Sequence, residues 1–216
     1  MKKFRKIIEG QILQTALTVF IAALLFKHPL FADIPVWLLL SAVFSSLVHQ
    51  LWVSFFWRTK LYGGFFSTHP NRWFLVYRIG FAIFAALRIA SFFVIAFYDT
   101  GTLHVTDSVR IVVSIILLVL SGYAMYSVIA YFGVERALGS DHFFPENAAN
   151  GFVKQGIFRI TSNGMYTYAV LFIHIVALYA DSPAALIISL FHHIHLWIHY
   201  FVTEKPDIVK IYGSTE

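Results

Sequence analysis

Cysteine is absent from the 216-residue sequence, which excludes disulfides, zinc–thiolate sites and catalytic thiols. Charged residues are also scarce at 12%, whereas 59% of the residues are hydrophobic and the mean hydropathy is +0.73. A soluble domain of this length normally needs more charge on its surface. The apolar residues fall in long blocks, so the composition predicts a single integral membrane domain over 1–216, without a separate soluble domain.

The long apolar blocks predict an all-α, polytopic transmembrane bundle of about six spans, because a bilayer core takes roughly 20 apolar residues per helical crossing. The expected spans cover 7–26, 34–57, 74–97, 109–132, 165–180 and 184–202. The basic start of the chain resembles that of a signal peptide, but no small-residue cleavage site follows the first block, which favours a retained helix. A turn at Asp181-Ser182-Pro183 should join the last two spans into a C-terminal helical hairpin.

The distribution of basic residues predicts the orientation of the bundle. Most of them fall on alternate loops and before the first span, so the positive-inside rule places both termini in the cytoplasm. The long hydrophilic segment 133–164 and the tail 204–216 share that side, and the apolar residues of the segment predict a cytoplasmic cap packed on the bundle. The net charge of +5 therefore reflects topology, and no nucleic-acid partner is expected.

Three segments near the C-terminus resemble one family. Residues 156–166, GIFRITSNGMY, are similar to the G-x-[FY]-R-x-x-R-[HN]-P-M-Y segment of the integral membrane methyltransferases, which include phosphatidylethanolamine N-methyltransferases and isoprenylcysteine carboxyl methyltransferases. Residues 203–213, TEKPDIVKIYG, look like the Glu-Glu-Pro/Tyr-Gly ending of that family, with Lys205 in place of the second Glu. Residues 131–143, YFGVERALGSDHF, look like a glycine-containing segment of its phospholipid branch.

The resemblance implies an enzyme that uses S-adenosyl-L-methionine as methyl donor, bound on the cytoplasmic side, and a membrane lipid as acceptor. It divides the chain into a scaffold with substrate-side helices at 1–130 and a methyltransferase core at 131–216. The phospholipid-branch features favour a phospholipid headgroup amine, while a prenylcysteine carboxylate or a small thiol stays open. The cofactor-binding candidates are Gly133, Gly139, Asn163, Gly164, Met165, Tyr166 and Glu204.

The residues themselves allow a functional and a structural interpretation. Asn163-Gly164 before an apolar block is a turn and a helix start, whose free N–H groups can hold a carboxylate, or a simple interfacial turn. Glu204, where the last span ends, can pair with an ammonium group or be an ordinary interfacial charge. Gly133 and Gly139 either admit a cofactor closely or merely break a helix.

Ionisable residues inside the spans are a further signal, because such residues are rare within membranes. His192, His195 and His199 share one face of the last span, with His174 on the span before it. They suggest either a metal site of a membrane oxidase or hydroxylase, or a hydrogen-bonded polar seam beside the cofactor pocket, in which His195 or His199 could accept a proton from an amine. The seam is the favoured interpretation, so no metal is expected.

Arg88 lies deep in the third expected span and should face another helix, with either a structural partner or a lipid phosphate. Two rivals to methyl transfer follow from these features: a metal-dependent membrane lipid oxidase built on the histidines, and a non-catalytic lipid-binding or transport protein. For methyl transfer, the residues expected to take part in catalysis are His195, His199 and Glu204, any of which could accept the proton.

Overall fold

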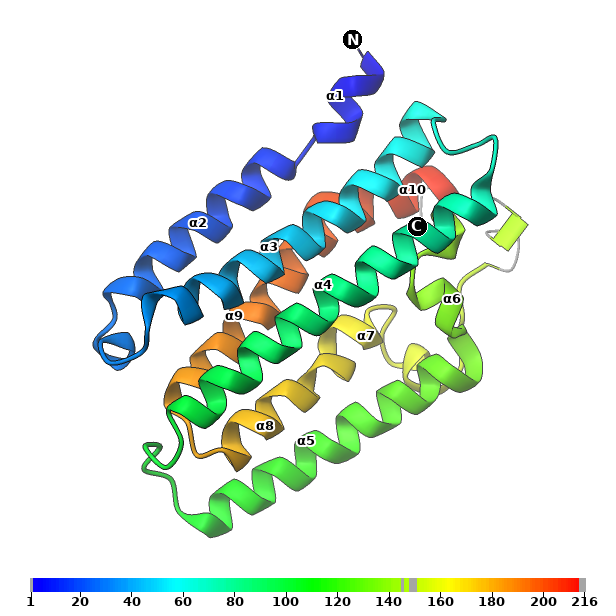
Figure 1. Cartoon of the computed structure of the whole chain (residues 1–216). Coiled ribbons are helices and arrows are strands. Elements are labelled where there is room, and N and C mark those ends of the chain that lie inside the picture. Colours follow the sequence, from blue (N-terminus) through cyan, green and yellow to red (C-terminus); the bar gives the residue numbers. More distant parts are fainter. Residues whose placement is uncertain (1, 145, 148–150, 214–216) are drawn as a thin grey trace.

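Long helices run side by side along most of the chain (Figure 1). The structure is a computed structural model that describes residues 2–144, 146–147 and 151–213. Helix accounts for 81% of it, and the described part contains no strand, which confirms the all-α bundle. The helices are α1 (Lys2–Ile8), α2 (Gln11–Lys27), α3 (Val36–Arg58), α4 (Pro70–Tyr98), α5 (Asp107–Ser127), α6 (Val134–Ala137), α7 (Gly164–Thr167), α8 (Phe172–Tyr179), α9 (Pro183–His199) and α10 (Lys205–Tyr212).

Short π- and 3₁₀-helical segments extend or connect these helices. The π-helical ones are η2 (Thr59–Gly63), η3 (Val128–Phe132) and η8 (Tyr200–Glu204), which continue α3, α5 and α9. The 3₁₀ segments include η1 (Pro29–Phe31), η4 (Ser140–His142), η6 (Gly156–Arg159) and η7 (Ala169–Leu171). Among the described residues, five continuous helices are long and apolar enough to cross a bilayer: Lys3–Lys27, Val36–Gly63, Pro70–Tyr98, Asp107–Phe132 and Pro183–Tyr212.

The expected span at 165–180 differs from this pattern. It is the shorter segment Gly164–Tyr179, interrupted by η7 between α7 and α8. Sixteen residues of continuous α-helix would cover about 24 Å, less than a hydrocarbon core of about 30 Å. A side chain of another helix accompanies the break, because His193 Nε2 on α9 donates to the carbonyl of Tyr166 at 2.8 Å.

The expected helical hairpin of α8 and α9 is confirmed, and side chains hold its turn. Asp181 takes a positive φ of 56°, and the Ser182 hydroxyl caps α9 by accepting from the Ala185 amide at 3.0 Å. Asp99, at the end of α4, accepts from the Ser182 hydroxyl and the Ala184 amide, both at 2.9 Å. The end of α4 therefore fixes the start of α9.

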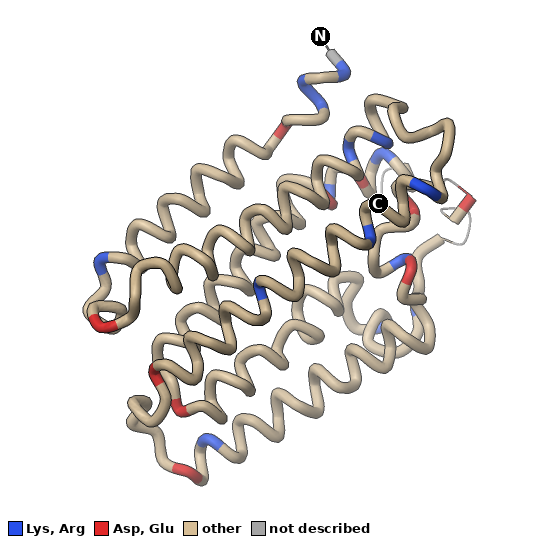
Figure 2. Tube along the Cα trace, viewed as in Figure 1, with Lys and Arg blue, Asp and Glu red and all other residues tan. Residues whose placement is uncertain are grey.

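Charges separate between the two ends of the bundle (Figure 2). Most Lys and Arg residues gather at the end that carries both termini, and the turn after α8 and the loop after α4 lie at the other end with Asp99, Asp107 and Asp181. We call the first the basic end. This asymmetry is the one that the positive-inside rule uses, and the assignment of the basic end to the cytoplasm stays a prediction.

Helices α3 and α4 approach each other closely at Gly80. A Cβ built on Gly80 would lie 2.3 Å from atoms of the Trp52 ring. That ring is held in place, because its Nε1 donates to the Tyr77 carbonyl at 3.1 Å. Small residues allow this kind of close backbone approach between membrane helices.

Gly80→Ala should therefore destabilise the fold, by about 1–3 kcal/mol for an overpacked core position. Gly122→Ala is the matched control, since Gly122 is also helical and a Cβ there meets nothing within 4 Å. The free energy of unfolding of both variants can be measured in detergent micelles. Equal stability of the two would show that α3 and α4 do not pack as described.

Candidate functional site

A buried ion pair lies at the basic end of the bundle, where the tail meets α3. Arg58 Nε is 3.3 Å from Asp207 Oδ1, and the two side chains are 2% and 0% exposed. The Tyr62 hydroxyl donates to the same carboxylate oxygen at 3.0 Å. Arg58 also donates to the carbonyls of Val202, at 2.9 Å, and of Glu9. One guanidinium thus joins α3, η8, α10 and the junction between α1 and α2.

The loop after α5 is attached to the tail by a second charged group. Arg136 Nε lies 3.1 Å from Asp141 Oδ2, and Arg136 Nη2 donates to the Tyr212 hydroxyl at 3.1 Å. The Tyr212 hydroxyl in turn donates to Asp141. Partial burial acts to lower the pKa of Arg136, but the hydrogen bond with Tyr212 and the charge of Asp141 outweigh it and raise the pKa. The loop after α5 and the last residues therefore fold together, as the sequence predicts.

The loop itself packs on the bundle, as its apolar residues predict. Phe143, Ile157 and Phe158 are buried, while Phe152 stays partly exposed and packs on Tyr212. The Ile157 amide donates to the Ser127 hydroxyl of α5 at 3.0 Å. The expected cap over the basic end is confirmed for these residues.

Buried polar side chains with unmet hydrogen-bonding capacity gather beside Asp207. The His142 ring stacks on Trp57 with 4.0 Å between ring centroids, and its Nε2 lies 3.6 Å from Asp207 Oδ2. We call this group the end cluster: Trp57, Tyr77, His142, His199 and Asp207. Its buried atoms without a hydrogen-bond partner in the described part of the chain are Trp57 Nε1, Tyr77 Oη, His142 Nδ1 and Nε2, His199 Nε2 and Asp207 Oδ2.

Unpaired buried polar atoms are costly and uncommon, so several of them in one place indicate a site that a polar ligand or water completes. The end cluster offers ring and indole N–H donors, a phenol and a carboxylate oxygen. Groups of these types can bind the carboxylate, ammonium and hydroxyl groups of a small polar molecule.

Tyr166 of α7 and Glu204 of η8 are in direct contact. The Tyr166 hydroxyl donates to the Glu204 carboxylate, and its ring packs near Trp197 and Tyr200, with centroids 5.9 and 5.3 Å away. The backbone of Tyr166 is fixed by His193, and His193 Nδ1 lies 3.2 Å from His174 Nε2. Two segments predicted from sequence to form one site, 156–166 and 203–213, are thus in direct contact.

The remaining cofactor-binding candidates differ in their surroundings. A Cβ on Gly139, whose φ is +82°, would lie 2.2 Å from the Trp57 ring, and a Cβ on Gly164 would lie 2.7 Å from Ile157, so both glycines serve close packing. Gly133 has a φ of +91° and open space around it. Met165 packs in the apolar cluster with Ile157, Phe158 and Ala124.

The helix expected to start after Asn163 is present, but it is short. Helix α7 is a single turn, Gly164–Thr167, because the chain breaks at η7. One turn of helix still has free N–H groups at its start, and whether they hold a carboxylate stays a prediction. The roles of Asn163 and the other candidates in cofactor binding stay predictions.

The histidines of α9 form a polar seam rather than one cluster. His195 is fully buried, with Nδ1 2.8 Å from the Ser46 hydroxyl and Nε2 3.5 Å from Gln14 Nε2. His192 contacts Arg88, and His199 Nδ1 lies 3.5 Å from the Ser54 hydroxyl. Across residues 2–144, 146–147 and 151–213, no group of three or more His, Cys, Asp or Glu residues could hold a metal ion.

These contacts separate the two histidines proposed as proton acceptors. Both ring nitrogens of His195 face partners on α2 and α3, which gives it a structural position away from the end cluster. His199 belongs to the end cluster, with its ring centroid 5.9 Å from that of Trp57, and its Nε2 has no partner in the described structure. A role in proton transfer stays a prediction for both.

Sequence reasoning missed the contribution of the first half of the chain. Trp57, Arg58 and Tyr77 come from α3 and α4, within 1–130, the part expected to form the scaffold and the substrate-side helices. Arg58 is visible in the sequence as a basic residue at the end of an expected span, but that pattern predicts only the orientation of the bundle. Its burial depends on the tail, which no pattern in the sequence links to α3.

Arg58→Met should be strongly destabilising, by about 3–5 kcal/mol, because it leaves the Asp207 carboxylate buried without its partner. The matched control is Arg78→Met, which removes an exposed pair with Glu135 at 3.2 Å and should change stability by less than about 1 kcal/mol. The measurement is the free energy of unfolding in detergent.

The double variant Arg58→Met/Asp207→Leu tests the cause of that loss. Replacing both charges with apolar side chains removes the unpaired carboxylate, so stability should recover in part. A cost for Arg58→Met no larger than that for Arg78→Met would show that the pair does not hold the tail.

Comparison with known proteins gives one match. The family model described as phospholipid methyltransferase matches residues 109–215. This range begins before Tyr131, where the resemblance seen in the sequence starts, and so includes α5. No curated protein and no solved structure matches the chain. The family match, together with the apolar helices, identifies the chain as a member of the integral membrane methyltransferase superfamily.

Proposed function

We propose that the protein transfers a methyl group from S-adenosyl-L-methionine to a phospholipid headgroup amine at the basic end of the bundle. The observation that carries this proposal is the contact between Tyr166 and Glu204, which joins the two segments that resemble the family. The family match supports methyl transfer to a phospholipid, and the end cluster beside Glu204 supports a polar ligand there.

The residues at this end suit the chemical groups of the proposed donor. The unpaired donors of His142, Trp57 and Tyr77 suit a carboxylate or hydroxyl oxygens, and the unpaired carboxylate oxygen of Asp207 suits an ammonium group. Gly133 leaves open space next to the loop. When bound, the cofactor supplies a methyl group already activated on a sulfonium.

The protein has two tasks in this proposal. It must align the acceptor with the methyl group, and fixing two reactants in place can supply several kcal/mol. It must also bind the acceptor as a free amine, although such amines have a pKa near ~10 in water. An apolar environment lowers that pKa, and Glu204, held at one carboxylate oxygen by Tyr166, can receive the proton.

The surroundings of Glu204 suit a zwitterionic headgroup. Phe201, one turn before it, is 56% exposed, and the Lys205 ammonium lies 5.9 Å from the centre of that ring. A carboxylate and an ammonium thus adjoin an apolar surface that lipid can reach. They can pair with the ammonium and the phosphate of one phospholipid headgroup. Lys205, a departure from the family ending, is thus compatible with a phospholipid acceptor.

Glu204→Gln should lower the turnover number for methyl transfer about 100-fold, the lower range for loss of a general base. The assay incubates purified protein with labelled methyl donor and native lipid extract and identifies the labelled lipid. Tyr166→Phe should cause a smaller loss, because it releases the carboxylate without removing it. Glu135→Gln, an exposed carboxylate on α6, is the control and should keep the rate of the unmodified protein.

Calorimetry with S-adenosyl-L-methionine separates this proposal from a non-catalytic lipid-binding or transport protein. Saturable binding with transfer of label to an amine-containing phospholipid is the expected result. Labelling of a prenylcysteine carboxylate or a thiol in place of lipid would redirect the acceptor. Absence of donor binding, or a full rate in Glu204→Gln, would overturn the proposed site.

A further inference from the structure

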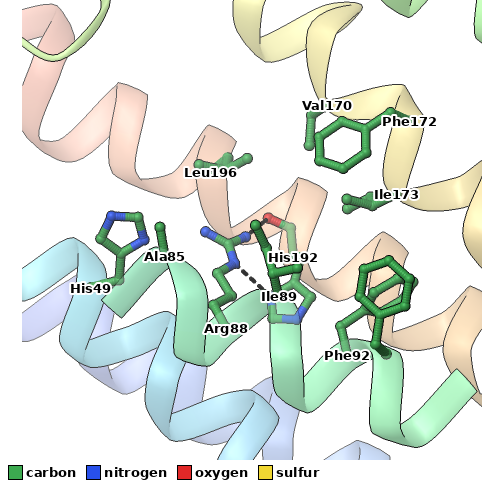
Figure 3. Close-up of a pocket in the computed structure, with 11 residues that line it drawn as sticks. His49, Ala85, Arg88, Ile89, Phe92, Val170, Phe172, Ile173, His192 and Leu196 are labelled. Carbon is green, nitrogen blue, oxygen red and sulfur yellow. Dashed lines mark hydrogen bonds between the residues drawn. The ribbon is translucent and has the colours of Figure 1, made fainter. Parts of the chain in front are cut away.

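A second polar site lies deep within the bundle, in a cavity of roughly 160 Å³ between α4, α9 and the segment from η7 to α8 (Figure 3). Most of its wall is apolar: Ala85, Ile89, Phe92, Phe93, Val170, Phe172, Ile173 and Leu196. Three polar side chains interrupt this wall, His49 from α3, Arg88 from α4 and His192 from α9.

Arg88 is the charged group that lines this cavity. Its Nε donates to His192 Nδ1 at 2.9 Å and its Nη2 to the His192 carbonyl at 2.8 Å. In the part of the chain that the structure describes, no carboxylate lies within ion-pair distance of it. The neighbouring His49 is 6% exposed, with neither ring nitrogen hydrogen-bonded, and His192 Nε2 is also buried without a partner.

The position of Arg88 makes this arrangement costly. It lies about 27 Å along the axis of α4 from Pro70 and about 15 Å from Tyr98, at 1.5 Å per residue. A guanidinium stays protonated in proteins, so a buried one needs an anion or many acceptors. His192 supplies two acceptors only, which leaves most guanidinium N–H groups and the His49 ring for another molecule.

We propose that this cavity binds the anionic oxygens of an amphiphile, a carboxylate or a phosphate, between Arg88 and His49. An arginine and ring N–H donors match such oxygens, and charge-assisted bonds of this kind are strong in a dry site. Ile89 and Phe172, both 42% exposed, border the cavity, so the apolar tail of the ligand passes between α4 and α8 into the surrounding lipid.

The site is separate from the one proposed for methyl transfer. His192 and Glu204 are 12 residues apart on one continuous helix, which is roughly 18 Å along its axis. In an ethanolamine headgroup only two carbons separate the amine from the phosphate ester oxygen. A phospholipid with its amine at Glu204 therefore cannot place its phosphate at Arg88, and the second site takes another molecule.

The test measures binding of oleate and of oleoyl lysophosphatidate to the purified full chain in neutral detergent, without methyl donor. Saturable binding of at least one anion, with a rise in melting temperature, is expected. The anion that binds more tightly shows whether the site recognises a carboxylate or a phosphate. Oleyl alcohol has the same tail without the charge and should bind at least ten times more weakly.

Two variants place the anion in the cavity. Arg88→Met should weaken binding at least tenfold, and Ala85→Leu should do the same by filling the cavity while leaving the guanidinium in place. Arg78→Met, an exposed arginine on the same helix, should bind like the unmodified protein. Equal binding of the alcohol, binding of neither anion, or full affinity in Ala85→Leu would overturn the proposal. Because no methyl donor is present, these outcomes do not depend on the proposed enzyme activity.

Discussion

The buried pair of Arg58 and Asp207 is the interaction on which the basic end of the molecule depends. Two charges with almost no exposure must stay together, since separating them leaves one charge buried alone. The pair therefore fixes α10 against the end of α3, and the carbonyls held by Arg58 fix η8 and the junction between α1 and α2. Glu204 lies less than one turn before Asp207, so the pair also positions the proposed proton acceptor.

Hydrogen bonding within the bundle explains why the unpaired polar atoms are informative. Most buried polar side chains between the helices have a partner on another helix or on their own backbone, such as Ser46 with His195 and Asp99 with Ser182. Hydrocarbon offers no alternative partner, so this pairing is the norm for a membrane protein. The exceptions concentrate in the end cluster and around His49 and His192. The two proposed binding sites lie at these two places.

How much the sequence could predict depended on whether the signal was local. Apolar blocks and basic loops predicted the long helices and the separation of charge, because both follow from the bilayer itself. The resemblance predicted Tyr166 and Glu204 as parts of one site, and the two side chains are in contact. The break in the short helical segment was not predictable in this way, because the hydrogen bond that accompanies it comes from His193 on another helix.

Arg58 and Arg88 also show what sequence alone could not predict, which is the partner of a charged side chain. Both were visible as basic residues at or within a span, yet one is paired with the tail and the other has only His192. A charge at a helix end has the same sequence pattern whether it faces water or a buried carboxylate. Only the tertiary contacts distinguish an interfacial charge, a structural pair and a binding group.

The π-helical segment η8 lies within the continuous helix that carries both the histidines and Asp207. His195, His199, Thr203 and Asp207 follow at intervals of four, and all four are buried. In a regular α-helix each step of four advances the face by about 40°, so the last residue would rotate well away from the first. The wider turn of η8 offsets this drift and keeps Asp207 on the buried face, toward Arg58. Helices α3 and α5 also end in π-helical segments, η2 and η3, so the helical irregularities that often accompany function coincide with the basic end.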